Sequence, residues 1–248
     1  MSFTLPPPIT PLTGLDAELK AQGSAVIDRS GLVALAGIDN AALDALPPFW
    51  GRLPPDTHLR DGGRYRRRRH SCFVVDGRSV AAVPHRAHWQ PVEYNALHGG
   101  FERWFEPVEP EMTALPAWAP LLSALGARAS ALRGPQAWFV EAHPFRIDTT
   151  DGIGRPTPEG AHRDGVDLVV VMLVARQGVK GGETRVFDAN GPQGMRFTMT
   201  EPWTTILLDD QRVIHETTPI QPLEPGRGHR DTLVLTFRRG GFQEPLPA

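Results

Sequence analysis

The sequence predicts a mainly β (α+β) protein, a sandwich or barrel with flanking helices. Glycine and proline number 25 each among 248 residues, which favours turns and short strands over a helix bundle. Between residues 137 and 238 short apolar runs alternate with turns, and they leave no room for the helices of a parallel doubly wound sheet. We expect residues 1–248 to form a single domain whose barrel core spans 137–238.

The composition is typical of a globular protein that binds neither nucleic acid nor membranes. Apolar residues make up 40% of the chain, charged residues make up 22%, and the formal net charge is −2. The single cysteine, Cys72, cannot form an internal disulfide, which fits a reducing compartment. The chain shows no signal-peptide pattern and no apolar run of about 20 residues. We therefore expect a cytoplasmic protein, and a homo-oligomer is possible.

The N-terminal region combines an extended arm with short helices. Residues 1–11 are rich in proline and are expected to be extended. The pattern then predicts a helix over 15–21 that stops at Gly23, and a strand over 25–27. A second helix is expected over 40–46, with Asn40 as its N-cap and two prolines after its end.

An arginine-rich segment, 64–69, begins the next predicted feature. Strand-like runs on either side of Asp76-Gly77 predict a β-hairpin. The arginines have three interpretations: a solvated strand face, inward-pointing side chains that bind a substrate carboxylate, or a nucleic-acid contact. Alternation along a strand would send Arg66 and Arg68 to the same side. Because the run is isolated and the protein slightly acidic, the nucleic-acid interpretation is the weakest of the three.

The middle of the chain changes from loop to helix to strands. Residues 85–100 read as a loop, and we interpret His85, His88 and His98 in it as surface or packing residues because their spacing fits no metal site. Apolar residues at helical spacing predict an amphipathic helix over 118–133 that packs outside a sheet. The strands predicted after it are 137–147, 166–174, 181–187, 204–208, 212–215 and 232–238.

Three residues form a candidate metal site. His162 and Asp164 lie two residues apart just before a β-branched run, and residues at this spacing point to the same side of an extended chain. His215 follows at the end of another strand. Two imidazoles and one carboxylate are the facial triad of non-haem Fe(II) oxygenases. A pair of the form His-x-Asp is weak evidence by itself, and His162 could be a structural histidine, but Arg230 and Thr232 on the last strand complete a larger pattern.

This pattern resembles the 2-oxoglutarate/iron(II)-dependent dioxygenases, which combine His-x-Asp and a distant His with Arg-x-Ser or Arg-x-Thr. The resemblance implies a double-stranded β-helix (jelly roll, cupin-like barrel). It also implies that Fe(II) is bound by His162, Asp164 and His215. The distal carboxylate of 2-oxoglutarate would be held by Arg230 and Thr232, which offer a bidentate charge-assisted pair and a further hydrogen bond, while O₂ takes the remaining metal position.

Stretches 158–165, 181–184 and 213–216 are similar to a bacterial subgroup that hydroxylates free L-amino acids such as isoleucine. The resemblance covers roughly 137–238 and is loose before it. It implies a dioxygenase that hydroxylates a small molecule, first of all a free L-amino acid, with release of succinate and CO₂. The alternatives are the same chemistry on a peptide, nucleobase or lipid, and a non-enzymatic metal- or ligand-binding barrel in a stress or biofilm-type pathway.

Other arginines qualify for carboxylate binding. Arg227 and Arg238 are rivals of Arg230, although Arg238 lies at the far end of its strand. The candidates for the substrate are Arg66, Arg68 and Arg146. Glu141 and His143 share the strand of Arg146, and these three residues could either face the pocket or form a salt-bridged rim.

Overall fold

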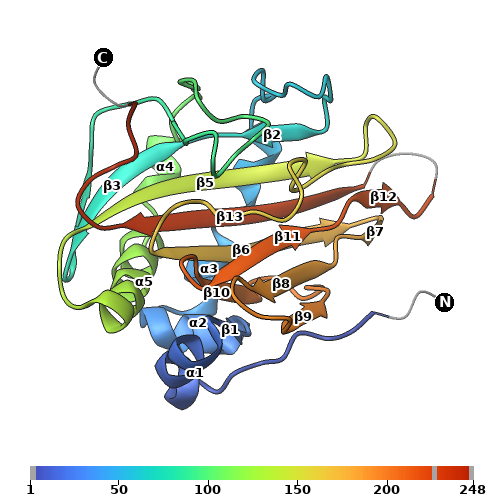
Figure 1. The fold of residues 1–248 in the computed structure, drawn as a ribbon. Helices are drawn as coiled ribbons and strands as arrows, with labels where there is room; N and C mark the ends of the chain where they lie inside the picture. Colours follow the sequence, from blue (N-terminus) through green and yellow to red (C-terminus); the bar gives the residue numbers. More distant parts are fainter. Residues whose placement is uncertain (1–3, 225–227, 246–248) are drawn as a thin grey trace.

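An eight-stranded antiparallel sheet dominates the computed structural model, which describes residues 4–224 and 228–245 (Figure 1). Its strand order is β1-β10-β6-β13-β5-β3-β4, and β2 also pairs with β5. A three-stranded sheet, β11-β8-β9, and a two-stranded sheet, β12-β7, complete the fold. The predicted mainly β class is confirmed, and the arrangement is consistent with a double-stranded β-helix.

The strands of the large sheet are β1 (Ser24–Ile27), β2 (Arg66–Arg68), β3 (Ser71–Asp76), β4 (Ser79–Ala82), β5 (Trp138–Asp148), β6 (Leu168–Gln177), β10 (Thr205–Asp209) and β13 (His229–Arg238). Those of the small sheets are β7 (Val179–Gly181), β8 (Thr184–Asp188), β9 (Gly194–Phe197), β11 (Val213–Thr217) and β12 (Ile220–Pro222). The helical segments are η1 (Leu12–Gly14), α1 (Leu15–Gln22), α2 (Arg29–Ala36), α3 (Asn40–Asp44), η2 (Pro47–Arg52), α4 (Pro110–Thr113) and α5 (Trp118–Arg133).

One face of the large sheet packs against the helices. Helix α1 contacts β1 and β10, and α5 contacts β3 and β4 (Figure 1). Strand β13 contributes Leu233, Leu235 and Phe237 to this core, and all three are fully buried. Gly126 lets α5 approach the sheet closely, because a Cβ at this position would lie only 2.9 Å from Cγ1 of Val75 on β3. Burial of these apolar faces supplies the main stabilisation of the domain.

Several predicted boundaries need correction. The helix expected over 40–46 starts at Asn40 but is capped by Asp39, whose carboxylate accepts the N–H of Ala42, and it ends at Asp44. Helix α2, capped by Asp28, was not predicted. The strand expected over 181–187 is broken by Gly181 and Gly182, both at positive φ, into β7 and β8. Local hydrophobic patterns do not report such backbone breaks.

Residues 4–11 of the predicted arm run alongside β1, and residues 1–3 lie outside the described residues. Thr10 donates its N–H to the Val26 carbonyl, and Leu5 packs on a smaller apolar cluster. Within the described ranges, no single helix is long and apolar enough to span a membrane. One bent pair, 29–36 with 40–52 at 109°, meets the length and composition criteria only when taken together.

Candidate active site

A cavity of about 130 Å³ lies between the face of the large sheet that is turned away from the helices and strand β11. We call it the central cavity. Alternate residues of β2, β5 and β13 line it, because side chains along a strand point to opposite faces. The same strands send their other residues into the helical core or to the surface.

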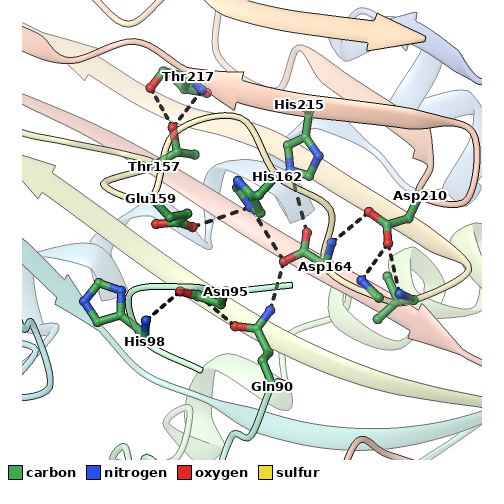
Figure 2. Close-up of polar contacts among 12 residues, drawn as sticks. Gln90, Asn95, His98, Thr157, Glu159, His162, Asp164, Asp210, His215 and Thr217 are labelled. Carbon is green, nitrogen blue, oxygen red and sulfur yellow. Dashed lines mark hydrogen bonds and ion pairs between the residues drawn. The ribbon is translucent and has the colours of Figure 1, made fainter. Parts of the chain in front are cut away.

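The three candidate metal ligands meet at this cavity, and Figure 2 shows their side chains pointing toward one another. His162 Nε2 lies 3.9 Å from Asp164 Oδ1, and His215 Nε2 lies 3.7 Å from Asp164 Oδ2. Their ligand atoms all lie within 4.8 Å of one another, so they can hold one metal ion. A backbone bridge between His162 and β11 brings the histidines together, with ring centroids 4.7 Å apart.

Hydrogen bonds orient two of these side chains. His162 Nδ1 lies 2.9 Å from the Gly160 carbonyl, to which it donates, and this leaves the lone pair of Nε2 for a metal. Gln90 donates to Asp164 Oδ1 at 3.2 Å (Figure 2). Among the described residues, Nδ1 of His215 has no hydrogen-bond partner.

Asp210, which was not predicted, holds the loop that carries Asp164. Its Oδ1 accepts the N–H of Asp164 at 2.9 Å, and its Oδ2 accepts those of Gly165 and Val166 at 2.7 and 3.0 Å (Figure 2). The strand expected from residue 166 therefore begins only at Leu168. The only sequence signal for this role was the Asp-Asp pair in the turn after β10.

The electrostatics of the triad favour a bound cation. Burial and the neighbouring His162 lower the pKa of His215 to about 3, so that its imidazole is neutral. Burial opposes protonation of His162, but the carboxylates of Asp164 and Glu159 raise its pKa. Burial and Glu159 raise the pKa of Asp164. A divalent cation would offset the cost of this buried negative charge, so the donor set fits a metal ion.

Arg230 provides a binding position for a second group in the cavity, an anion. It is 3% exposed and lines the central cavity, and its Nε and Nη2 have no hydrogen-bond partner among the described residues. Burial and the nearby Arg176 lower its pKa to about 10. Thr232, also 3% exposed, lines the cavity on the same strand. A buried cation without a partner is costly, and a carboxylate in the cavity would remove that cost.

The rival arginines are placed differently. Arg238 also lines the cavity, but at the other end of β13, and it donates to the Gly241 carbonyl at 2.6 Å. Arg227 lies outside the described residues.

A family model described as 2OG-Fe dioxygenase matches residues 47–236. The chain belongs to this family. The family implies Fe(II), 2-oxoglutarate and O₂, and the protein is accordingly a 2-oxoglutarate-dependent oxygenase with a small-molecule substrate. Iron, with 2-oxoglutarate and O₂, supplies in this family the oxidising chemistry that amino-acid side chains lack. The donor set and the unpartnered Arg230 fit these groups.

Solved structures of the family's fold align with nearly the whole chain. A bsmA homolog from Methylobium petroleophilum PM1 is 57% identical, with 96% of this chain and 97% of that chain covered and a TM-score of 0.92. IDO from Bacillus thuringiensis is 16% identical, with 98% of each chain covered and a TM-score of 0.75. The Fe(II)/α-ketoglutarate-dependent dioxygenase TqaL is 24% identical, with 92% and 87% covered and a TM-score of 0.71. No curated protein matches this 2OG-Fe dioxygenase.

The arginine run divides as strand alternation requires. Arg66 and Arg68 line the central cavity and are 6% and 3% exposed, whereas Arg67 faces outward, 3.6 Å from Asp148. The exposed Arg64 pairs with Asp151. The inward-pointing interpretation thus describes the positions of Arg66 and Arg68, and the solvated-face interpretation describes those of Arg64 and Arg67.

Arg146 does not line the cavity, so its assignment as a substrate ligand needs correction, and the salt-bridged interpretation describes its position. On β5 the residues that line the cavity are odd-numbered, and Arg146 lies on the opposite face. It forms two hydrogen bonds with Asp231, at 2.8 and 2.7 Å. We therefore drop Arg146 from the candidate substrate ligands.

A second group of ionisable residues in the cavity wall was missed. His70, His88, Glu141 and His143 are all buried and bring their polar atoms within 4.8 Å of one another. His88 and His98 are buried as packing residues would be, yet His88 contacts the Glu141 carboxylate, a role that its spacing in sequence did not indicate. Glu141 and His143 lie on β5, His70 lies in the connection between β2 and β3, and His88 lies in a loop, so no local sequence motif predicts the group.

Proposed function

We propose that the protein hydroxylates a free L-amino acid, in a reaction that consumes 2-oxoglutarate and O₂ and releases succinate and CO₂. In this proposal His162, Asp164 and His215 bind iron, and Arg230 with Thr232 binds the distal carboxylate of 2-oxoglutarate. The substrate carboxylate binds to Arg68, assisted by Arg66. Such pairing is bidentate and charge-assisted.

The observation that carries the proposal is the setting of Arg68. Its guanidinium carbon lies 3.9 Å from the ring centroid of Phe105 and 4.4 Å from that of Phe145, so it forms cation–π contacts with both rings. Its Nε has no hydrogen-bond partner among the described residues, and no carboxylate pairs with it there. By contrast Arg66 pairs with Asp56 at 2.7 Å. Arg68 is therefore the cavity-lining cation of β2 that most needs an anionic ligand.

Strand register supports separate places for the two carboxylates. Across β2, β5 and β13, Arg66 is aligned with Ile147 and then Arg230, and Arg68 is aligned with Phe145 and then Thr232. One strand thus separates the two arginine positions, or roughly 10 Å between strand axes. A co-substrate at Arg230 and a substrate at Arg68 would not compete for the same cation.

The test is turnover with each of the twenty L-amino acids in the presence of Fe(II), 2-oxoglutarate and ascorbate. We expect at least one to increase succinate formation and to gain one oxygen atom by mass spectrometry. His162→Ala, assayed in parallel, should give neither signal. If no amino acid is oxidised while the protein still consumes 2-oxoglutarate, the substrate is not a free amino acid, and peptides and nucleobases become the next candidates.

A further inference from the structure

The group formed by His70, His88, Glu141 and His143, which we call the His-Glu cluster, converges on one oxygen atom. Oε2 of Glu141 lies 2.5 Å from His88 Nδ1, 3.1 Å from His70 Nε2 and 3.5 Å from His143 Nε2. Among the described residues, every hydrogen bond and ion pair of this carboxylate involves Oε2 and none involves Oε1. Glu141 also lines the central cavity. Its second oxygen is therefore available to a ligand.

The hydrogen-bond partners of the histidines imply that they act as donors toward Glu141. Arg68 Nη2 lies 2.6 Å from His143 Nδ1, and because a guanidinium only donates, Nδ1 must accept. The proton of the neutral His143 ring is then on Nε2, which faces Glu141. Burial lowers the pKa of His70 and His143, and it lowers that of His88 to about 3. Neutral rings that donate N–H groups stabilise an ionised Glu141 without cancelling its charge.

The same observations argue against a second metal in the cluster. A metal would need the lone pair of His143 Nε2, but the hydrogen bond from Arg68 places the proton there. Two ligands on one tetrahedral zinc lie roughly 3.3 Å apart, given bonds of about 2.0–2.2 Å, whereas His88 and Glu141 are 2.5 Å apart. Arg66, Arg68 and Arg103 add buried positive charge to the same wall of the cavity.

Spacing within the wall matches an α-amino acid. Arg68 and Glu141 lie at the two nitrogen atoms of one imidazole ring, that of His143, at 2.6 and 3.5 Å. A cation and an anion are thus held one ring apart, both facing the cavity. In an α-amino acid one carbon atom separates a carboxylate from an ammonium group. With a hydrogen bond of about 2.8 Å at each end, the molecule can contact both groups at once.

We propose that Glu141 Oε1 binds the ammonium group of the substrate while Arg68 binds its carboxylate, so that the site selects α-amino acids with a free amino group. This inference rests on the proposed function and deepens it, because it excludes 2-hydroxy acids, N-acylated amino acids and internal residues of a peptide. Glu159 is the rival anion. It lies 3.5 Å from His162 Nε2, and among the described residues one of its oxygens is unpartnered, but it lies beside the metal site and forms no ion pair with Arg68.

The experiment compares binding and turnover in the iron-loaded protein under 2-oxoglutarate. The probes are the twenty L-amino acids, with the 2-hydroxy acid and the N-acetyl derivative of each one that binds. Binding is measured anaerobically by calorimetry, and turnover by succinate release. In the wild type we expect the amino acid to bind at least about thirtyfold more tightly than either analogue. Glu141→Gln should lose a similar factor for the amino acid and little for the 2-hydroxy acid, and Glu183→Gln, outside the cavity, should change neither.

The outcomes separate this inference from the proposed function. If an amino acid is oxidised but its 2-hydroxy and N-acetyl analogues bind equally well, or if Glu159→Gln alone removes the preference, Glu141 is not the ammonium site. Because the analogue series uses the wild type, this answer does not depend on how well a variant folds. If His162→Ala, which lacks the triad site, still binds one equivalent of metal, the His-Glu cluster is a metal site and the inference fails. If no amino acid binds or is oxidised, the proposed function itself fails.

Discussion

His162 and His215 are joined through their backbones: each donates its N–H to the carbonyl of the other, at 3.0 Å in both directions. This isolated bridge pairs the loop residue His162 with β11, so backbone hydrogen bonds rather than a bound metal determine where the imidazoles lie. Substitution of either side chain leaves this pairing possible. The triad can therefore be tested by mutation without dismantling its scaffold.

We expect His162→Ala and Asp164→Ala to abolish stoichiometric iron binding, because each removes one of the three ligands that the described part of the chain brings together there. Metal analysis after reconstitution with Fe(II) measures the effect, and circular dichroism verifies the fold. His229→Ala, outside the central cavity, is the control. Full iron occupancy in both triad variants would refute the assignment. Zinc or nickel in the purified wild type would not, since intrinsic affinities let them displace iron.

Arg230→Ala should weaken 2-oxoglutarate binding at least about tenfold and leave iron binding nearly intact, because removal of one partner of a buried charge pair costs about 2–5 kcal/mol. Titration of 2-oxoglutarate into the anaerobic Fe(II) protein, followed by the metal-to-ligand absorption band, measures the affinity. Arg238→Ala should bind normally, since that arginine is already bonded to the Gly241 carbonyl. A loss in Arg238→Ala alone would move the co-substrate to the other end of β13.

Arg68→Ala should raise the KM for the amino acid strongly while uncoupled 2-oxoglutarate turnover stays measurable, because the change removes a substrate contact but no metal ligand. Arg67→Ala is a matched control one residue away on the outward face of β2, and its KM should equal that of the wild type. Equal KM values in the two variants would show that the substrate carboxylate is held elsewhere.

Asp210→Ala should destabilise the protein and weaken iron binding, although residue 210 is not a ligand. The substitution leaves three N–H groups near Asp164 without their acceptor, at about 1–3 kcal/mol for each donor that water cannot reach. Thermal unfolding and iron titration measure the two effects. Asp188→Ala removes a similar carboxylate–backbone bond in an exposed turn, so it should change both little. If the iron affinity of Asp210→Ala is unchanged, the Asp210 carboxylate does not position Asp164 for metal binding.

Stability should fall as the pH drops below about 6.5. Burial lowers the pKa of His98 to about 4 and that of His88 to about 3. The unfolded chain therefore binds protons between these values and pH 6.5 while the folded chain does not, so the free energy of unfolding decreases with falling pH. By pH 5 each such histidine should cost about 1–2 kcal/mol. Urea unfolding at pH 7.5 and pH 5 measures the difference in the free energy of unfolding. His98→Gln should reduce this difference. An identical pH dependence in that variant would show that His98 does not contribute to it.

The sequence by itself determined the residues whose arrangement is local. His162 and Asp164 needed only the alternation of an extended chain, and Arg230 with Thr232 needed only that of β13. The opposite directions of Arg66 and Arg67 follow from the same two-residue period. These patterns are readable because neighbouring side chains on one strand differ in environment.

Only the tertiary structure decided which residues of β5 face the cavity. Its pattern of burial does not alternate, because the helical core covers one face and the cavity wall lies on the other. The two-residue period places Glu141 and Arg146 on opposite faces of β5, but it does not say which face lines the cavity. In the structure Glu141 lines the cavity and Arg146 pairs with Asp231. The His-Glu cluster likewise depends on the pairing of β3 with β5 and on the loop of His88. Such contacts between distant segments leave no periodic signal in the chain.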